Sequence, residues 1–106
     1  MRHGEWITVH PVPGSFTILV GAFLEIASNG RCKSAVHRTT VDDRAARISV
    51  GSGLSPPPEN VKITPAPKLV ENAKSGAKFR SVTCQEFIQL FQSNSTDKSE
   101  LDLIRM

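Results

Sequence analysis

The fold is decided by three stretches that follow one another: SNGRCKSAVHR at residues 28–38, VDDR at residues 41–44 and RIS at residues 47–49. The Asn29-Gly30 pair is the strongest short-range hairpin signal, because both residue types tolerate positive φ. The residues after it, 31–41, favour a strand, and the aspartates that follow supply a turn into a second strand over residues 45–50. We therefore predict two strands joined by an acidic turn.

These two strands carry side chains with binding chemistry. Arg47 and Ser49 are two residues apart, so in a strand they point to the same face. A guanidinium and a hydroxyl on one face together hold a carboxylate, and a metal-binding His37 on the neighbouring strand would lie near that pair. A lone histidine is more often structural than a ligand, and an Arg-x-Ser pair is more often solvated. Both interpretations stay open at this point.

The chain around this pair also predicts strands. Apolar and β-branched runs at residues 5–10, 16–20 and 23–27 are separated by Pro, Gly and Asn turn residues. Trp6 and Phe16 are the expected core aromatics of these runs. Five short strands with turns between them predict a mainly-β fold, an antiparallel sandwich or barrel.

The second half of the chain changes character after residue 54. Residues 55–60 form a proline-rich loop, and residues 61–67 are extended at best. Thr83-Cys84-Gln85-Glu86 is a capping box, which predicts a helix that carries an apolar face through Phe87 and Phe91. A second short helix is expected from about Asp97. We predict a division into residues 1–54, which hold the strands, and residues 55–106, which hold the loop and the helices.

Composition excludes several classes of function. The 106 residues allow one small domain, and the net charge of +3 comes from interleaved charges without stacking aromatics, so no nucleic-acid partner is expected. Cys32 and Cys84 lack a metal-site spacing, and a disulfide between them is left open. The polar start predicts no signal peptide, and the longest apolar run is too short for a membrane span. A cytoplasmic protein is expected.

The combination SNGRCKSAVHRTTV…RISV resembles the C-terminal part of plant iron(II)- and 2-oxoglutarate-dependent dioxygenases, which include flavonoid, gibberellin and salicylate oxidising enzymes. The resemblance runs from about Glu5 to the end of the chain. It implies part of a double-stranded β-helix, or jelly roll, with one or two short C-terminal helices. It also implies Fe(II) and 2-oxoglutarate as cofactors, a small-molecule substrate, His37 as the last iron ligand, and Arg47 with Ser49 as the pair that binds the distal carboxylate of 2-oxoglutarate.

The sequence departs from the family pattern at several positions. The family supplies two iron ligands from an upstream His-x-Asp, and none occurs here; His3-Gly4-Glu5 lies where the family has a loop, so we do not assign it. Ala22 stands where the family has an aspartate. Residues 51–54, GSGL, replace an aromatic that would line the pocket.

These departures set the functional expectation. We predict a partial dioxygenase, belonging to plant secondary metabolism in its complete form and inactive as this isolated chain, with no catalytic residue of its own. The alternative is a non-catalytic interaction protein that self-associates through unpaired strand edges.

Overall fold

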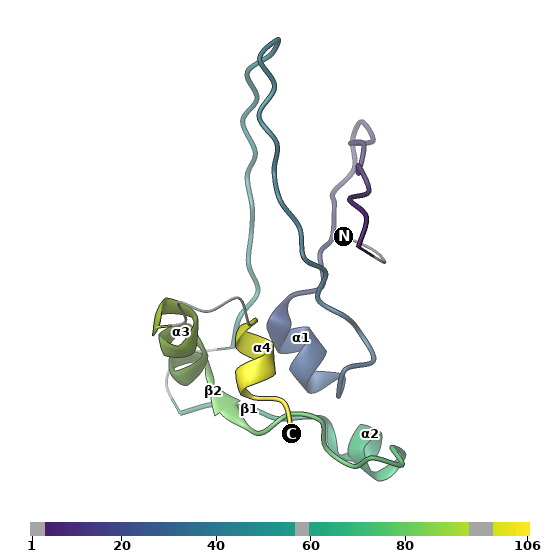
Figure 1. Ribbon diagram of the computed structural model, residues 1–106, viewed down its shortest axis with the longest axis vertical. Coiled ribbons are helices and arrows are strands. Elements are labelled where there is room, and N and C mark those ends of the chain that lie inside the picture. The colour runs from purple at the N-terminus through teal and green to yellow at the C-terminus, as the bar shows by residue number, and fades with distance from the viewer. Residues whose placement is uncertain (1–3, 57–59, 94–98) are drawn as a thin grey trace.

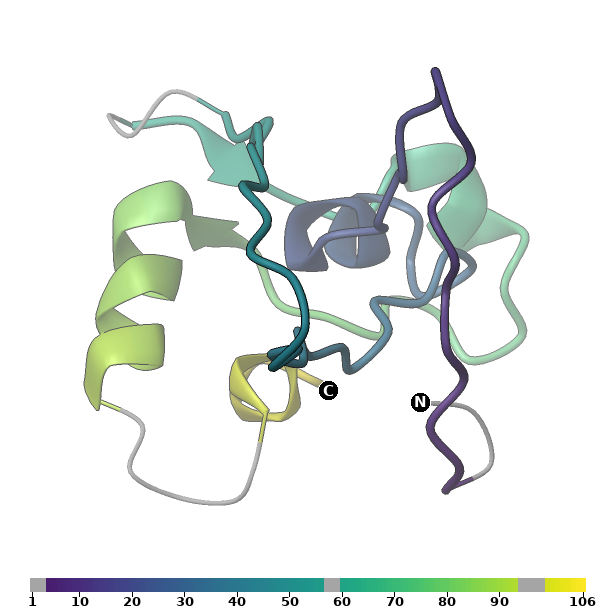
Figure 2. The same cartoon turned by 90° about the horizontal axis from the view of Figure 1, so that it is seen from above.

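The computed structural model describes residues 4–56, 60–93 and 99–106. A base of short elements carries long extended segments that project away from it (Figure 1). In chain order, the elements are α1 (Ala22–Ala27), β1 (Lys62–Ile63), α2 (Pro67–Glu71), β2 (Val82–Thr83), α3 (Cys84–Ser93) and α4 (Glu100–Leu103). Seen from above, α1 lies between α3 and α2 (Figure 2).

Helix α1 corrects the strand that we predicted over residues 23–27. The run is too short to separate helical from strand periodicity by pattern alone. Phe23 and Ile26 are three residues apart and so share one face of a helix. Ile26 is fully buried there, and the Phe23 ring meets the Phe87 ring edge-on at 5.1 Å between centroids. Packing of this face against α3 therefore selects the helix.

The Asn29-Gly30 pair ends α1 instead of turning a hairpin. The Gly30 N–H donates to the Glu25 carbonyl at 2.8 Å and the Asn29 N–H to the Ile26 carbonyl at 2.9 Å, which is the Schellman pattern. Asn29 has φ 51° and Gly30 has φ 76°. Both residues thus adopt the positive φ that their types tolerate, but the predicted hairpin is wrong.

The sheet of the described residues has two strands. β1 and β2 are antiparallel, with Lys62 opposite Thr83 and Ile63 opposite Val82. The C-terminus extends this layer, because the Arg80 N–H donates to the Ile104 carbonyl and the Met106 N–H to the Lys78 carbonyl, each at 2.9 Å. The end of the chain is thus fixed to the segment before β2.

One apolar cluster joins α1, the two strands, α3 and the C-terminal turn. Its buried members are Ile26, Ile63, Phe79, Val82, Phe87, Leu101 and Ile104. The predicted core aromatics lie elsewhere: Phe16 is 95% exposed and Trp6 is half exposed. The prediction of Trp6 and Phe16 as core residues is therefore wrong.

The remaining predicted strands are extended segments that do not form a β-sheet. Apart from a single bridge position at Glu5, residues 5–10, 16–20, 31–41 and 45–50 belong to no strand ladder of the described chain. We call residues 4–20 the N-terminal arm, 35–42 the outgoing arm and 45–54 the returning arm; Figure 1 shows all three away from the base. A strand needs partners on its edges and a face to bury. The mainly-β content is thus not confirmed, and helices make up most of the regular structure of the described residues.

The C-terminal predictions agree better with the structure. The Thr83 N–H donates to Glu86 Oε2 at 2.8 Å and the Glu86 N–H donates to Thr83 Oγ1 at 3.1 Å, so the capping box is confirmed. Helix α3 follows it, and α4 contacts α3. The expected start of α4 near Asp97 and the centre of the proline loop lie outside the described residues. Both cysteines are free, with Cys32 exposed and Cys84 buried.

Candidate functional site

Arg47 and Ser49 line one solvent-open groove of about 430 Å³ between the outgoing and returning arms. Their spacing places both side chains on the same side of the returning arm, as the alternation of an extended chain requires. The other lining residues are Thr39, Thr40, Val41, Asp42, Ala45 and Ala46. The structure therefore brings this predicted pair together.

The polar groups of this groove suit a carboxylate. Arg47 offers a planar fork of N–H donors and Ser49 one hydroxyl, which together match the oxygens of a carboxylate. Asp42 is the opposing charge in the groove, and its Oδ1 accepts the Arg44 N–H at 2.8 Å across the turn. This hydrogen bond orients one oxygen of Asp42 toward the backbone of the turn at residues 42–44.

His37 is exposed on the outgoing arm and is not among the residues that line the groove. Its Nδ1 lies 3.0 Å from the Ala35 carbonyl oxygen. A carbonyl only accepts, so Nδ1 carries the proton and a neutral ring keeps the lone pair on Nε2. This tautomer is the one that a metal-binding Nε2 requires. The structure thus orients His37 but does not place it with Arg47 and Ser49.

The described residues do not fit a complete iron site. Iron(II) in oxygenases is held by two histidines and a carboxylate. Within residues 4–56, 60–93 and 99–106, no three His, Cys, Asp or Glu side chains gather closely enough to hold a metal ion. His3, of the unassigned His-Gly-Glu stretch, lies outside those ranges. His37 therefore stands as a single candidate ligand.

A contact beside His37 connects two of the arms. The Arg38 guanidinium lies over the Trp6 ring, with its central carbon 4.1 Å from the ring centroid. A cation over an aromatic face is attracted by the ring quadrupole. This contact places the N-terminal arm next to the outgoing arm at the residue that follows His37.

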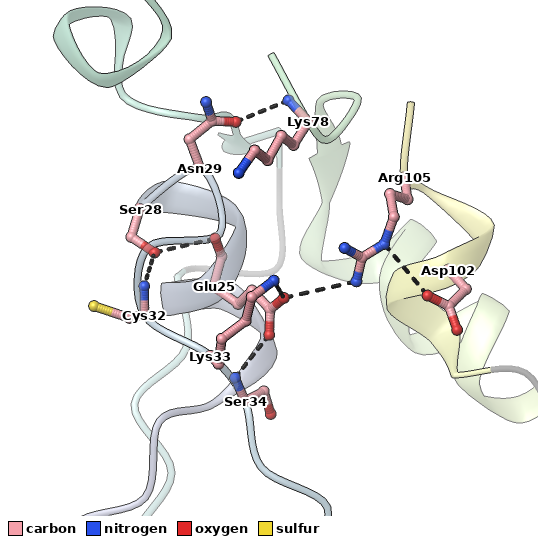
Figure 3. A network of polar contacts seen from close by, with 9 residues as sticks. All are labelled: Glu25, Ser28, Asn29, Cys32, Lys33, Ser34, Lys78, Asp102 and Arg105. Atoms are coloured by element: carbon pink, nitrogen blue, oxygen red, sulfur yellow. Dashed lines mark hydrogen bonds and ion pairs between the residues drawn. The ribbon is translucent and has the colours of Figure 1, made fainter. Parts of the chain in front are cut away.

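Sequence reasoning missed a second polar cluster, at the root of the outgoing arm (Figure 3). The Glu25 carboxylate accepts the Ser34 N–H at 2.7 Å through Oε2 and the Lys33 ammonium at 3.1 Å through Oε1. The Arg105 Nη2 atom lies 3.7 Å from the same Oε1. A glutamate inside the apolar run Phe23-Leu24-Glu25-Ile26 was the signal available in the sequence, because buried carboxylates are rare without partners.

No helix of the described residues has the length and apolar character that crossing a membrane requires. Residues 1–56 match the model of the 2OG-Fe(II) oxygenase superfamily. The chain is 36% identical to 2-oxoglutarate-dependent dioxygenase 19 of Oryza sativa subsp. japonica over 104 residues, which are 97% of this chain and 30% of the relative.

Two further relatives show the same pattern. Oxoglutarate-dependent flavonoid 7-O-demethylase 1 of Ocimum basilicum is 37% identical over 106 residues, covering 99% of this chain and 28% of the relative. Gibberellin 3-beta-dioxygenase 1 of Arabidopsis thaliana is 43% identical over 84 residues, covering 79% and 23%. The chain thus spans between 23% and 30% of the length of these curated relatives.

Proposed function

Because the chain belongs to the 2OG-Fe(II) oxygenase superfamily, we propose that it is the part of an iron(II)- and 2-oxoglutarate-dependent dioxygenase that binds the distal carboxylate of 2-oxoglutarate. Fe(II) and 2-oxoglutarate are the cofactors that this family implies, and its fold is a jelly roll. The observation that carries the proposal is the placement of Arg47 and Ser49 on one groove. We also propose that the chain divides between residues 54 and 55 into the dioxygenase-domain part and the C-terminal extension.

The proposed roles follow from the donors that each residue offers. Arg47 holds the carboxylate through a bidentate pair of N–H bonds and Ser49 through its hydroxyl. His37 supplies one metal ligand through Nε2, the nitrogen that carries the lone pair in the neutral ring when Nδ1 donates to the Ala35 carbonyl. Iron(II) and 2-oxoglutarate, when bound, supply the oxidising chemistry, and the protein binds and orients.

The proposed substrate class and activity follow from the relatives and from the missing ligands. Relatives act on flavonoids and gibberellins by their names, so a small plant metabolite is the proposed substrate of the complete enzyme. No three His, Cys, Asp or Glu side chains of the described residues gather to hold iron, so we propose that the isolated chain does not turn over 2-oxoglutarate. A cytoplasmic location and the lack of a nucleic-acid partner stay predictions.

Titration of the purified chain with 2-oxoglutarate by calorimetry tests the carboxylate site. We expect saturable binding that weakens about 10- to 100-fold in Arg47→Ala, because a hydrogen bond to a charged group contributes about 1.5–3 kcal/mol. Arg44→Ala removes a neighbouring guanidinium that does not line the groove and is the matched control. Equal affinity of Arg47→Ala and wild type would contradict the proposal.

Succinate formation in the presence of iron(II) and 2-oxoglutarate tests the proposed inactivity. We expect none above the level of free iron(II). Iron-dependent succinate formation that is lost in His37→Ala would overturn the proposed inactivity.

A second function is favoured by the exposed apolar side chains of the arms. Val41 is fully exposed and Ile48 is 95% exposed, and exposed apolar side chains on extended segments invite pairing with another chain. Self-association through the arms is the corresponding proposal. Sedimentation velocity over a concentration series should show dimers that Ile48→Lys removes and Ile88→Lys, on α3, retains. A monomer at all concentrations would exclude this function.

A further inference from the structure

Glu25 is a charged residue buried in the base. Its side chain is 3% exposed, and it sits on α1 next to the core residue Ile26. A buried carboxylate is tolerated when its oxygens are paired and hydrogen-bonded. Both oxygens meet this condition: Lys33 and Ser34, at the root of the outgoing arm, donate hydrogen bonds to them, and Arg105 near the C-terminus forms an ion pair with Oε1 (Figure 3).

The Ser34 bond lies at the boundary between the base and the arms. Residues 28–30 are buried and Ser34 is half-buried, whereas every residue from 35 to 55 is exposed. The loop before Ser34 is closed locally, since the Cys32 N–H donates to Ser28 Oγ at 3.0 Å. Glu25 Oε2 then accepts the Ser34 N–H at 2.7 Å. This bond fixes the place where the outgoing arm leaves the base.

The other Glu25 oxygen faces the end of the chain. Arg105 reaches Glu25 Oε1 at 3.7 Å, and its Nε lies 3.3 Å from Asp102 Oδ1. The same guanidinium lies over the Phe79 ring at 5.3 Å from the centroid. Glu25 therefore connects the start of the outgoing arm to the C-terminal residues, which pack against the core.

We propose that Glu25 is a positioning residue for His37, acting through the Ser34 N–H. Ser34 precedes His37 by three residues, which is roughly 10 Å of extended chain, so a fixed Ser34 limits where the imidazole can lie. The inference rests on the proposed function for the role of His37. The positioning depends on the length of the Glu25 side chain, which brings its carboxylate to the Ser34 N–H. The negative charge of Glu25 acts mainly in its ion pairs with Lys33 and Arg105.

Two variants of Glu25 separate the effect of its side-chain length from the effect of its charge. Glu25→Gln keeps the length of the side chain and an oxygen that accepts the Ser34 N–H, but it removes the charge. Glu25→Asp keeps the charge and shortens the side chain by one methylene, which withdraws the acceptor. Glu86→Gln is the matched control, because Glu86 also accepts a backbone N–H, that of Thr83, at 2.8 Å and far from the arm in sequence.

Backbone ¹⁵N relaxation and amide hydrogen exchange of residues 34–37 are the readouts, with the amides of α3 reporting on the base. In wild type and Glu25→Gln we expect a protected Ser34 amide and order parameters near those of the base. In Glu25→Asp we expect loss of Ser34 protection and order parameters below about 0.6 for residues 35–37, with α3 unchanged. Glu86→Gln should leave residues 34–37 as in wild type.

Three outcomes would overturn the inference. These are a wild-type segment 34–37 that is already flexible, an Asp variant that stays ordered, or a loosening that spreads equally to α3. The readouts need no ligand, so they are independent of the 2-oxoglutarate titration. An ordered segment together with no effect of Arg47→Ala on binding would therefore refute the proposed function and retain Glu25 as an anchor of the outgoing arm.

Discussion

Asn29 is hydrogen-bonded to the backbone of Lys78 across 49 residues of sequence, with its Oδ1 accepting the Lys78 N–H at 2.8 Å. Its Nδ2 donates to the Gly76 carbonyl at 3.0 Å, so one side-chain amide satisfies two backbone groups of the segment before β2. Asn29 also holds the left-handed position that ends α1. The residue thus joins the end of α1 to the second half of the chain.

Replacement of Asn29 should separate these two roles. Asn29→Gly keeps the positive φ and loses both bonds, which should lower the free energy of unfolding by about 1–3 kcal/mol. Asn29→Ala loses the bonds and also pays for a left-handed alanine, a further cost of roughly 1–2 kcal/mol. Urea unfolding followed by circular dichroism measures both values. An alanine variant as stable as the glycine variant would show that backbone conformation contributes little.

Removing one methyl group from an isoleucine should change the free energy of unfolding in the base but not in the arms. Ile26 is fully buried, so Ile26→Val should lower the free energy of unfolding by about 1 kcal/mol. Ile48→Val makes the same change at a side chain that is 95% exposed and should have no measurable effect on the monomer. Thermal unfolding of both variants at low protein concentration provides the comparison. Equal losses would mean that Ile48 is buried in solution.

The capping box predicts how stability depends on acidity. The Thr83 N–H that donates to Glu86 lowers the pKa of Glu86 below its ordinary value of 4.5, and Arg80 and Lys62 act in the same direction. A lowered pKa in the folded state means that Glu86 stabilises the fold at neutral pH. This contribution is lost as the pH falls from 4.5 through the lower folded value.

The Glu86→Gln variant tests this pH dependence. Its Tm should lie below that of wild type at pH 7, and the two Tm values should converge in acid. A difference that persists well below pH 4.5 would contradict the role of the charge.

The Arg38–Trp6 contact should be visible by fluorescence, because Trp6 is the only tryptophan of the chain. Arg38→Gln uncovers the ring face, so we expect Trp6 emission to shift to longer wavelength. Arg38→Lys keeps a cation and should shift it less. Arg44→Gln is the control, and a shift of equal size there would refute the contact.

The parts of the fold that sequence reasoning predicted are those fixed by local hydrogen bonds. The Thr83–Glu86 capping box reads directly from the sequence, because both partners lie within one turn. The same holds for the positive φ of Asn29 and Gly30. Helix α2 was missed because Pro67 was taken as the end of an extended run, whereas proline is also well suited to the first turn of a helix.

The parts that were mispredicted depend on long-range partners. Phe23 faces Phe87, 64 residues later, and nothing in a six-residue run announces that contact. Arg47 and Ser49 line one groove, as expected from alternation, which is a local property of extended chain, and their role in binding a carboxylate stays a prediction. Glu25 escaped notice because its hydrogen-bond donor Ser34 and its ion-pair partner Arg105 come together only in the folded chain.

The end of α1 also determines how the chain ages chemically. Asn-Gly is the dipeptide in which the glycine nitrogen most readily attacks the side-chain amide, releasing ammonia through a succinimide ring. Here the Gly30 nitrogen donates to the Glu25 carbonyl, and the Asn29 amide is held by Gly76 and Lys78. Deamidation should therefore be slow in the folded chain and rapid once α1 unravels. An isoaspartate formed there inserts an extra carbon into the backbone. Its presence in a molecule would therefore indicate that α1 of that molecule had unfolded.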